Sequence, residues 1–548
     1  MTFKDSLLKW YPTLRHVEDY PEDIGAEISN KDQIAGNNDQ KLDIDASVLS
    51  VDTDNDSTPV EYRDEANRPW WKFFDEYEYR YNRYETKRHK WWLWFEEGTS
   101  KEEKKLLFKL DILVAGYVFM VYWVKSLDSS NISNAYVSNM KEDLNFQGND
   151  YVNTVTVFNV SSVIFQIPAM YLFPRFPLHL YFPILDAGWG LFTLFSYKVQ
   201  NVGQIQAMRF FVGAFESGFY AAVHYILVSS SGLFQAAVFR NLDGANGLAG
   251  WRWMFIVDAV CTLPLALIGF LFVPGTPYSC YSIWLTDDEI RLARRRLKKA
   301  NITPPSAKPP NFLDKDLWKR VLKTWKLYVL TLFSIGCWNS STTAGSGYIL
   351  WLKSLKRYSI PQVNDLSIIA PLIGIILITL VCGGADVFRS RSGAIICSSI
   401  LNFVSCLILL IWDVPEGAKW FGFAILYAGW ASASVIYSFC NDILRKDPQE
   451  RAITFILLYS ISQSTNVWIV KLIWPTVDAP RYTVGYGTTL AFVFYLIIVT
   501  LITLYYYKRD EERIARENGI VLYNSQTGDI PPEVKAHLNK TQGTELTN

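Results

Sequence analysis

The sequence reads AMRFFVGAFESGFYAAVHYILV between residues 207 and 228. An α-helix of this length, rising about 1.5 Å per residue, spans the roughly 30 Å hydrocarbon layer of a membrane. Arg209, Glu216 and His224 stand inside the run. An ionisable side chain at such depth costs roughly 2.5–3.5 kcal/mol on insertion scales, so these groups usually serve a function. The stretch therefore predicts a polar pathway for a charged solute through a membrane protein.

Ten further apolar runs are long enough, or nearly so, to cross a membrane as helices. They cover residues 106–124, 151–173, 180–199 and 254–273 before a polar central loop, and 327–351, 366–382, 394–412, 418–440, 452–474 and 487–507 after it. The sequence thus predicts an all-α polytopic membrane protein, with five crossings before the loop and six after it.

The composition agrees with this class and excludes others. Hydrophobic residues make up 50% of the chain and aromatic residues 15%, and the formal net charge is zero. The charges are sorted into loops and give no sign of nucleic-acid binding. The seven cysteines have no metal-ligand or disulfide spacing. No P-loop or nucleophile elbow occurs, so we expect neither an enzyme nor a cofactor nor a metal site.

Basic clusters orient the chain in the membrane. A cluster between Arg291 and Lys299 marks the cytoplasmic side, and Thr286 with Glu289 forms a capping box that opens a short helix, Thr286–Lys299. Both termini are then cytoplasmic. The expected segments are an N-terminal tail (1–105), an N-terminal helical half (106–277), a cytoplasmic loop (278–325), a C-terminal helical half (326–507) and a C-terminal tail (508–548).

One crossing is short. The fourth run should end inside near Val228, whereas the next full run should begin outside near Trp251. Residues 229–240 would reach only about 18 Å as a helix, and an extended strand would leave unpaired backbone groups in hydrocarbon. The sequence therefore predicts that helix 5 is truncated or missing. Either the chain folds with a broken N-terminal half and transports poorly, or the sequence represents a deleted allele or a faulty gene model. A re-entrant element is the alternative.

Six short motifs carry a resemblance to known proteins. They are Leu127-Asp128 followed by Asn131-Ile132-Ser133-Asn134-Ala135, Arg209-Phe210 with Gly213 and Glu216, Gly250-Trp251-Arg252-Trp253, Leu285-Thr286 with Glu289, Asp478-Ala479-Pro480-Arg481-Tyr482, and Gly384-Ala385-Asp386 with Arg389 and Arg391. The last resembles the loop signature of the major facilitator superfamily, whose fold has two six-helix halves. The others resemble the fungal allantoate permease family of anion:cation symporters. Within that family, the stretch 350–358 and the tail 519–524 look closest to a yeast member linked to ethionine-sulfoxide sensitivity.

The resemblance implies proton-coupled anion uptake at the plasma membrane, and related permeases carry sulfonates and inorganic sulfur anions. It also implies gating or structural roles for Asp128, which could instead cap its helix, and for Asp386, Arg389 and Arg391.

The residues of the fourth run also suggest chemistry by themselves. Arg209 and Glu216 are two turns apart and share a helix face, with His224 close to it. A guanidinium matches carboxylate or sulfonate oxygens, so Arg209 is the expected anion contact. Glu216 and His224 are expected to couple a proton. An Arg209–Glu216 ion pair without any solute is the alternative.

Three amides, Asn131, Gln463 and Asn466, are further candidates for solute binding. The alternative for Asn131 is that it caps its helix, and the alternative for Gln463 and Asn466 is interhelical hydrogen bonding. The partners that we expect are membrane lipids, a small anionic solute and protons. The sequence makes no prediction of oligomeric state.

Two functions follow from these patterns. The first is a proton-coupled symporter of small organic or sulfur-containing anions. The second is a non-transporting degenerate paralogue or nutrient sensor of the same fold. Among symporters, the rival substrates are allantoate or ureidosuccinate, monocarboxylate vitamins and small peptides. One arginine binds the negatively charged group of a solute but does not distinguish the carbon skeleton that carries this group.

Overall fold

The computed structural model describes residues 13–17, 48–51, 60–79, 100–172, 176–217, 245–299, 314–341, 346–517, 519–528 and 530–536. These residues belong to two compact units. The first unit comprises residues 1–18, 100–383 and 394–500, and the second comprises residues 19–99, 384–393 and 501–548.

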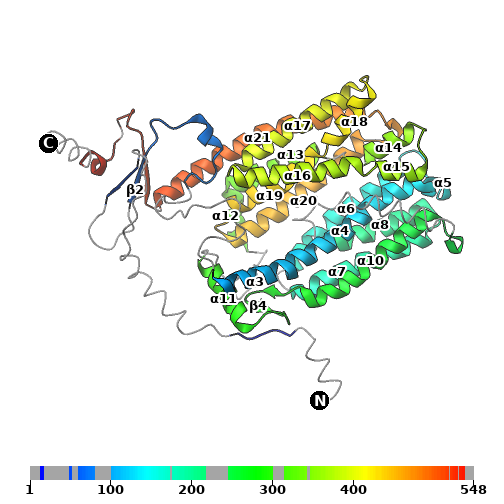
Figure 1. Ribbon diagram of the computed structural model, residues 1–548, viewed down its shortest axis with the longest axis horizontal. Helices are drawn as coiled ribbons and strands as arrows, with labels where there is room; N and C mark the ends of the chain where they lie inside the picture. The colour runs from blue at the N-terminus through cyan, green and yellow to red at the C-terminus, as the bar shows by residue number, and fades with distance from the viewer. Residues whose placement is uncertain are drawn as a thin grey trace, which may run out of the picture. The chain divides into compact units, whose positions relative to one another are not determined.

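Helices dominate the first unit (Figure 1). Its N-terminal half contains α3 (Lys101–Leu110), the π-helical turn η2 (Asp111–Gly116), α4 (Tyr117–Ala135), η3 (Tyr136–Met140), α5 (Lys141–Asp143), α6 (Asp150–Leu172), α7 (Leu178–Phe195), η4 (Ser196–Lys198), α8 (Val202–Glu216), η6 (Ala245–Gly247), α10 (Gly250–Phe272), the short strands β3 (Gly275–Thr276) and β4 (Ser279–Cys280), and α11 (Asp287–Lys299).

The C-terminal half follows, and three of its helices, α16, α17 and α21, continue into the second unit. It contains α12 (Lys315–Lys323), α13 (Trp325–Ser340), α14 (Ser346–Ser354), α15 (Ile360–Leu366), α16 (Ile369–Val387), α17 (Arg391–Ile411), α18 (Glu416–Ile425), α19 (Ala428–Ile443), α20 (Pro448–Ile473), η7 (Thr476–Asp478) and α21 (Thr483–Glu517).

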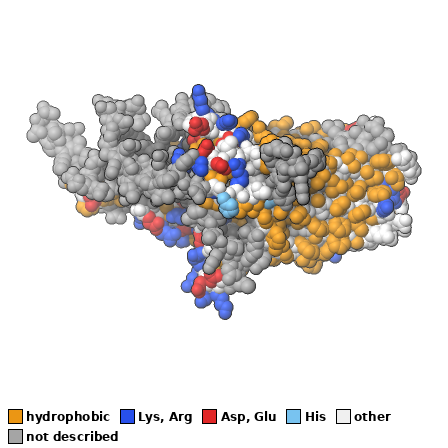
Figure 2. Space-filling view, turned by 90° about the horizontal axis from the view of Figure 1, so that it is seen from below, with side chains coloured by type: hydrophobic (Ala, Val, Ile, Leu, Met, Phe, Trp, Pro, Cys, Tyr) orange, Lys and Arg blue, Asp and Glu red, His pale blue; other side chains and the backbone are white. Residues whose placement is uncertain are grey.

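Nine helical segments among the described residues are long and apolar enough to cross a membrane, and each matches one predicted run. Of the two remaining runs, 207–228 is described only to Ser217, within and just after α8. The run 327–351 is divided between α13 and α14. Exposed side chains such as Leu267, Ile376 and Leu472 suit contact with lipid tails. Figure 2 shows hydrophobic side chains gathered over one such surface.

The predicted shortage at helix 5 concerns residues that the structure leaves undescribed. Residues 218–244 lie outside the described ranges, and they include His224 and most of the stretch between Val228 and Trp251. The missing crossing therefore stays a prediction.

Close helix contacts hold each half together. In the N-terminal half α7 packs on α10, α6 on α8, and α4 on α10, while α13 packs on α19 and α20 in the C-terminal half. A Cβ atom added at Gly213 of α8 would lie 2.4 Å from the Phe158 carbonyl oxygen of α6. Ser162 donates to the Gly213 carbonyl over 3.1 Å. Small residues permit this close approach, as is common between membrane helices.

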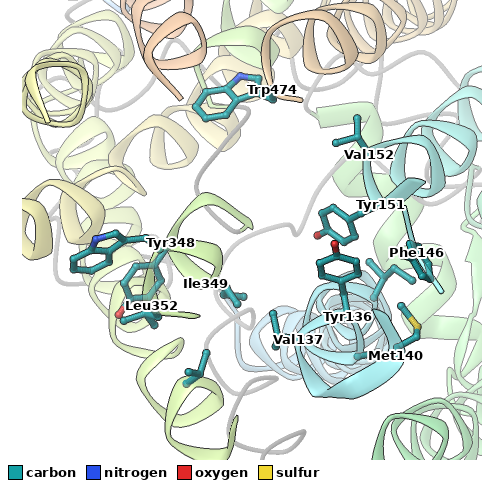
Figure 3. Close-up of a cluster of buried hydrophobic side chains, with 14 of the residues drawn as sticks. Tyr136, Val137, Met140, Phe146, Tyr151, Val152, Tyr348, Ile349, Leu352 and Trp474 are labelled. Carbon is teal, nitrogen blue, oxygen red and sulfur yellow. The ribbon is translucent and has the colours of Figure 1, made fainter. Parts of the chain in front are cut away.

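The two halves meet at the end of the first unit that carries α5, α14 and α15. One buried apolar cluster there contains residues of both halves, several of which Figure 3 shows. The rings of Tyr136 and Tyr151 lie 4.5 Å apart, between centroids. Lys353 Nζ of α14 donates to the Val137 carbonyl of η3 over 3.4 Å. The described conformation thus joins the two halves at this end.

The predicted capping box is confirmed. The Thr286 amide donates to Glu289 Oε2 over 2.9 Å, and the Glu289 amide donates to Thr286 Oγ1 over 3.3 Å. Glu289 also accepts a hydrogen bond of 2.7 Å from Lys109 Nζ of α3. The central-loop helix α11 is therefore fixed to the N-terminal half.

The second unit joins segments from both ends of the chain. Its sheet has the order β1 (Val48–Val51), β2 (Val60–Asp64) and β5 (Ile520–Tyr523), with β2 antiparallel to β1 and parallel to β5. Before α17, the Glu76 carboxylate accepts hydrogen bonds from the amides of Arg391 and Ser392 over 3.0 and 2.8 Å. These bonds satisfy amides at the start of α17 that no helical carbonyl can reach.

Candidate functional site

Arg209 lies on the buried face of α8, where its side chain is 4% exposed. Its Nη1 donates to Asp128 Oδ2 of α4 over 2.8 Å, and Thr193 of α7 donates to Asp128 Oδ1 over 3.0 Å. The guanidinium carbon lies 4.5 Å from the centre of the Phe158 ring. Arg209 Nε has no hydrogen-bond partner among the described residues. Part of the guanidinium fork therefore remains available to another acceptor.

Glu216 stands two turns farther along α8 and faces another residue of α4. Its carboxylate lies 3.3 Å from Lys125 Nζ, and the two side chains are 2% and 3% exposed. The alternative of an Arg209–Glu216 pair is therefore wrong, because each residue pairs with α4 instead. Lys125 and Asp128 are three residues apart, so one face of α4 presents both partners. Asp128 lies inside α4 and does not cap its end.

Asp186 is a third buried acid, on α7. Tyr117 at the start of α4 donates its hydroxyl proton to Asp186 over 2.8 Å, and Trp189 Nε1 lies 3.3 Å from the other oxygen. Asp186 is thus held by two neutral donors, with no cation bonded to it among the contacts described.

Asp258 of α10 is a fourth buried acid, and neither of its carboxylate oxygens has a hydrogen-bond partner among the described residues. Asn131 of α4 lies beside it and is itself buried.

The cluster holds more acids than bases in the part of the chain that the structure describes. Its six ionisable residues are the bases Lys125 and Arg209 and the acids Asp128, Asp186, Glu216 and Asp258. Burying net charge in a membrane is expensive. An arrangement with surplus acids can therefore take up protons, and its arginine can bind an anion.

Three helices of the C-terminal half, α13, α19 and α20, contribute neutral polar groups to the described bundle. Trp338 Nε1 donates to the Tyr437 hydroxyl over 2.8 Å, and Ser334 Oγ donates to Ser462 Oγ over 2.8 Å. The Tyr459 ring lies 5.5 Å from that of Trp338. Hydroxyls and rings of this kind suit neutral amide or ring groups.

The three predicted amides differ in their contacts. Asn466 donates to the Trp338 carbonyl over 3.1 Å, which is the interhelical bonding considered as its alternative. Gln463 is buried and its Nε2 has no partner among the described residues, like both polar atoms of Asn131. Gln166 of α6 accepts from Ser460 of α20 over 3.4 Å and so links the two halves.

The remaining predicted residues fall elsewhere. His224 lies outside the described residues. Asp386, Arg389 and Arg391 belong to the second unit. The Arg389 amide donates to the Asp386 carbonyl over 3.3 Å where α16 ends, and the Arg391 guanidinium lies 5.8 Å from the Tyr77 ring.

Sequence reasoning assigned no role to Lys125, Asp186 or Asp258. Asp186 and Asp258 each interrupt an apolar run, and the same feature identified Arg209 as a candidate in the sequence. Lys125 follows directly after the run 106–124 and so reads as a flanking charge, but α4 continues to Ala135. Only the observed helix length places it inside the bundle.

The chain is similar to several fungal proteins. It is 42% identical over 575 aligned residues to a vitamin H transporter of Saccharomyces cerevisiae, with 97% of each chain covered. It is 32% identical to a pantothenate transporter of Schizosaccharomyces pombe, covering 71% of this chain and 79% of the relative. It is 30% identical to a pantothenate transporter of S. cerevisiae, covering 71% and 81%. The first alignment is longer than the 548 residues of the chain, so it contains positions of the relative without a counterpart here.

Two solved structures share the fold. The proton:xylose symporter XylE of the major facilitator superfamily matches with a TM-score of 0.53 and 12% identity, over 74% of this chain and 96% of that one. The transporter PepTSo matches with a TM-score of 0.51 and 11% identity, over 73% and 98%. No family model matches the chain. These matches confirm the predicted all-α fold of the major facilitator superfamily. The truncation of helix 5 remains a prediction.

Proposed function

We propose that this chain, which belongs to the fungal transporters of the major facilitator superfamily, carries a small organic or sulfur-containing anion across the plasma membrane together with a proton. One observation carries the proposal above all. Arg209 is buried with its Nη1 bonded to Asp128, while its Nε has no partner among the described residues. A membrane protein has little reason to keep such a donor unless an acceptor arrives.

A carboxylate is the anion that this geometry favours. A guanidinium binds two carboxylate oxygens with parallel hydrogen bonds, whereas a lysine offers a point charge. Asp128 holds Arg209 in place and competes with the solute for it. This competition allows the solute to leave as well as to bind.

The two halves offer different chemistry to the two ends of a solute. The N-terminal half supplies Arg209 and Lys125, and the C-terminal half supplies neutral donors and rings such as Trp338 and Tyr437. A vitamin such as biotin joins one carboxylate to a neutral ureido ring. We therefore place monocarboxylate vitamins first among the substrates, a choice that the similarity to vitamin H and pantothenate transporters supports. Sulfonates and inorganic sulfur anions are the rivals.

Glu216 and His224 remain our candidates for the coupled proton. One oxygen of Glu216 faces Lys125 and the other has no hydrogen-bond partner in the described part of the chain. A proton on that oxygen would remove the negative charge that Lys125 balances, so solute binding and protonation would influence one another.

The proposal also includes the predicted roles of the other site residues, the predicted topology and the predicted family. Asn131, Gln463 and Asn466 line the solute path, and Asp128, Asp386, Arg389 and Arg391 act in gating. Both termini are cytoplasmic, and the chain is a member of the allantoate permease family within the superfamily.

A second candidate function is a non-transporting protein of the same fold. The short stretch between Val228 and Trp251 favours it, and the gaps in the alignment with the vitamin H transporter agree with a missing segment without locating it.

Uptake of labelled biotin, pantothenate, taurine and thiosulfate tests both candidates in yeast cells stripped of their own permeases. We would compare the chain with Arg209→Ala, Arg209→Lys and a version with helix 5 restored from a relative. Arg481→Ala is the matched control, because Arg481 forms an exposed ion pair with Asp413. Uptake lost in both Arg209 variants and kept in the control supports the symporter. Uptake only by the restored version would show that this chain is a damaged carrier.

A further inference from the structure

Asp258 is a buried acid that the function above leaves unused, and Asn131 lies beside it. Asp258 of α10 is 2% exposed and Asn131 of α4 is completely buried. Among the described residues, neither Asp258 oxygen and neither Asn131 polar atom has a hydrogen-bond partner that meets normal geometry. The two side chains are nevertheless close enough to interact.

In the part of the chain that the structure describes, no cation forms an ion pair with Asp258. Among the described residues, the charged groups that act on Asp258 are Asp128 of α4, and Arg209 and Glu216 of α8. Lys125 and Asp186 belong to α4 and α7, the helices that pack on α10. Both cations already face other acids, Lys125 facing Glu216 and Arg209 facing Asp128. The nearest acids repel a negative charge on Asp258.

A protonated Asp258 fits this site better than a carboxylate. Burying an unpaired carboxylate costs far more than burying a neutral carboxylic acid, so such a group takes a proton instead. The acid form has one O–H to donate and can still accept through its other oxygen. The Asn131 amide offers both an acceptor and a donor, which complements that form.

We propose that Asp258, positioned by Asn131, is a proton-binding site that takes up and releases the proton carried with the solute. This inference rests on the proposed function and adds a third group to Glu216 and His224. A proton binds to the Asp258 carboxylate from the side with the higher proton concentration and leaves to water on the other side. No covalent bond to the solute forms or breaks.

Infrared spectroscopy tests the proton directly and needs no solute. The full-length chain in lipid nanodiscs is compared with Asp258→Asn at neutral pH. In the unchanged chain we expect the carbonyl absorption of protonated carboxyl groups to contain a component that is lost in Asp258→Asn. Asp413→Asn, which changes an exposed acid, should keep that component. The same absorption in the chain and in Asp258→Asn overturns the proposal.

Transport in proteoliposomes then tests coupling, with labelled biotin as the probe. Asp258→Asn mimics the protonated form permanently, so we expect biotin exchange to continue while accumulation driven by a pH gradient is lost. Gradient-driven accumulation by Asp258→Asn, or loss of exchange in a folded variant, overturns the proposal.

Two further results separate the possible failures. If Asp258→Asn does not fold, Asp258→Glu replaces it, and a shifted pH profile of uptake supports the proposal while an unshifted one contradicts it. If biotin uptake by the unchanged chain ignores the pH gradient, the proposed proton coupling fails, and the infrared result alone decides whether Asp258 binds a proton.

Discussion

A buried arginine in a membrane protein needs an acceptor, and Arg209 has one in Asp128, which in turn accepts from Thr193. Such a pair contributes little net stability, because the attraction between the charges is offset by their desolvation. Replacing only one member of the pair is strongly destabilising, because the other charge is then left buried and unpaired.

We therefore expect Arg209→Gln or Asp128→Asn alone to lower the free energy of unfolding by about 3–5 kcal/mol. The double variant should lose much less than the sum, because it leaves no unpaired charge. Chemical unfolding in detergent micelles measures all three variants. Arg481→Gln, which breaks an exposed pair, should cost at most about 1 kcal/mol. Additive losses in the double variant would contradict the pairing.

The sequence identifies Arg209 and Glu216 because they interrupt an apolar run, and Asp186 and Asp258 interrupt apolar runs in the same way. It does not identify their partners. Those depend on which residues of α4 face α8, and hence on the length of α4 beyond Lys125. Spacing along one helix suggested an Arg209–Glu216 pair, whereas neighbouring helices supply nearer partners.

Most helices were predictable from hydrophobicity, since nine of the eleven runs match single membrane-spanning segments among the described residues. The run 327–351 divides near its polar centre, Asn339-Ser340-Ser341, where α13 ends. The sheet of the second unit was not predicted, because β2 and β5 are brought together from opposite ends of the chain. No local pattern records such a pairing.

The central-loop helix α11 should separate from α3 in acid. Partial burial would raise the pKa of Glu289, but hydrogen bonds from Lys109 and Thr286 outweigh it and hold the pKa below its usual value of 4.5. The contact therefore stabilises docking above pH 4.5, and this stabilisation is lost as the pH falls through the lowered value. Spin-label distances between the two helices should lengthen in acid. In Glu289→Gln they should no longer depend on pH in this range.

Glu76 should stabilise the start of α17. Glu76→Ala removes the acceptor for the Arg391 and Ser392 amides and should cost about 1 kcal/mol, as for other helix caps. Glu76→Gln keeps one acceptor oxygen and should lose less. Amide hydrogen exchange in the first turn of α17 measures the effect. Unchanged exchange in Glu76→Ala would show that the cap is dispensable.

The missing fifth crossing can be tested by antibody access to intact cells. With a tag inserted after Asp243, we expect labelling only after the cells are permeabilised. A tag after Lys356, in a loop that the predicted topology places outside, is the positive control. Labelling of the Asp243 tag on intact cells would show that the chain crosses between Val228 and Trp251 after all.

At the scale of the whole molecule, the two halves of the first unit carry different chemistry. In the described part of the N-terminal half, Lys125, Asp128, Asp186, Arg209, Glu216 and Asp258 are buried, while α13, α19 and α20 of the C-terminal half carry buried hydroxyls, amides and rings. A buried cluster joins the halves at one end. These features fit a carrier in which the N-terminal half binds the charged group of a solute and couples its transport to protons. The C-terminal half would bind the neutral part of the solute.

Uptake of labelled biotin by cells that express only this chain, at acidic and neutral external pH, tests that account most directly. We predict uptake that is faster at acidic pH, is abolished by a proton uncoupler and is lost in Arg209→Ala. Uptake of equal rate at both pH values, insensitive to the uncoupler and unchanged in Arg209→Ala, would contradict it.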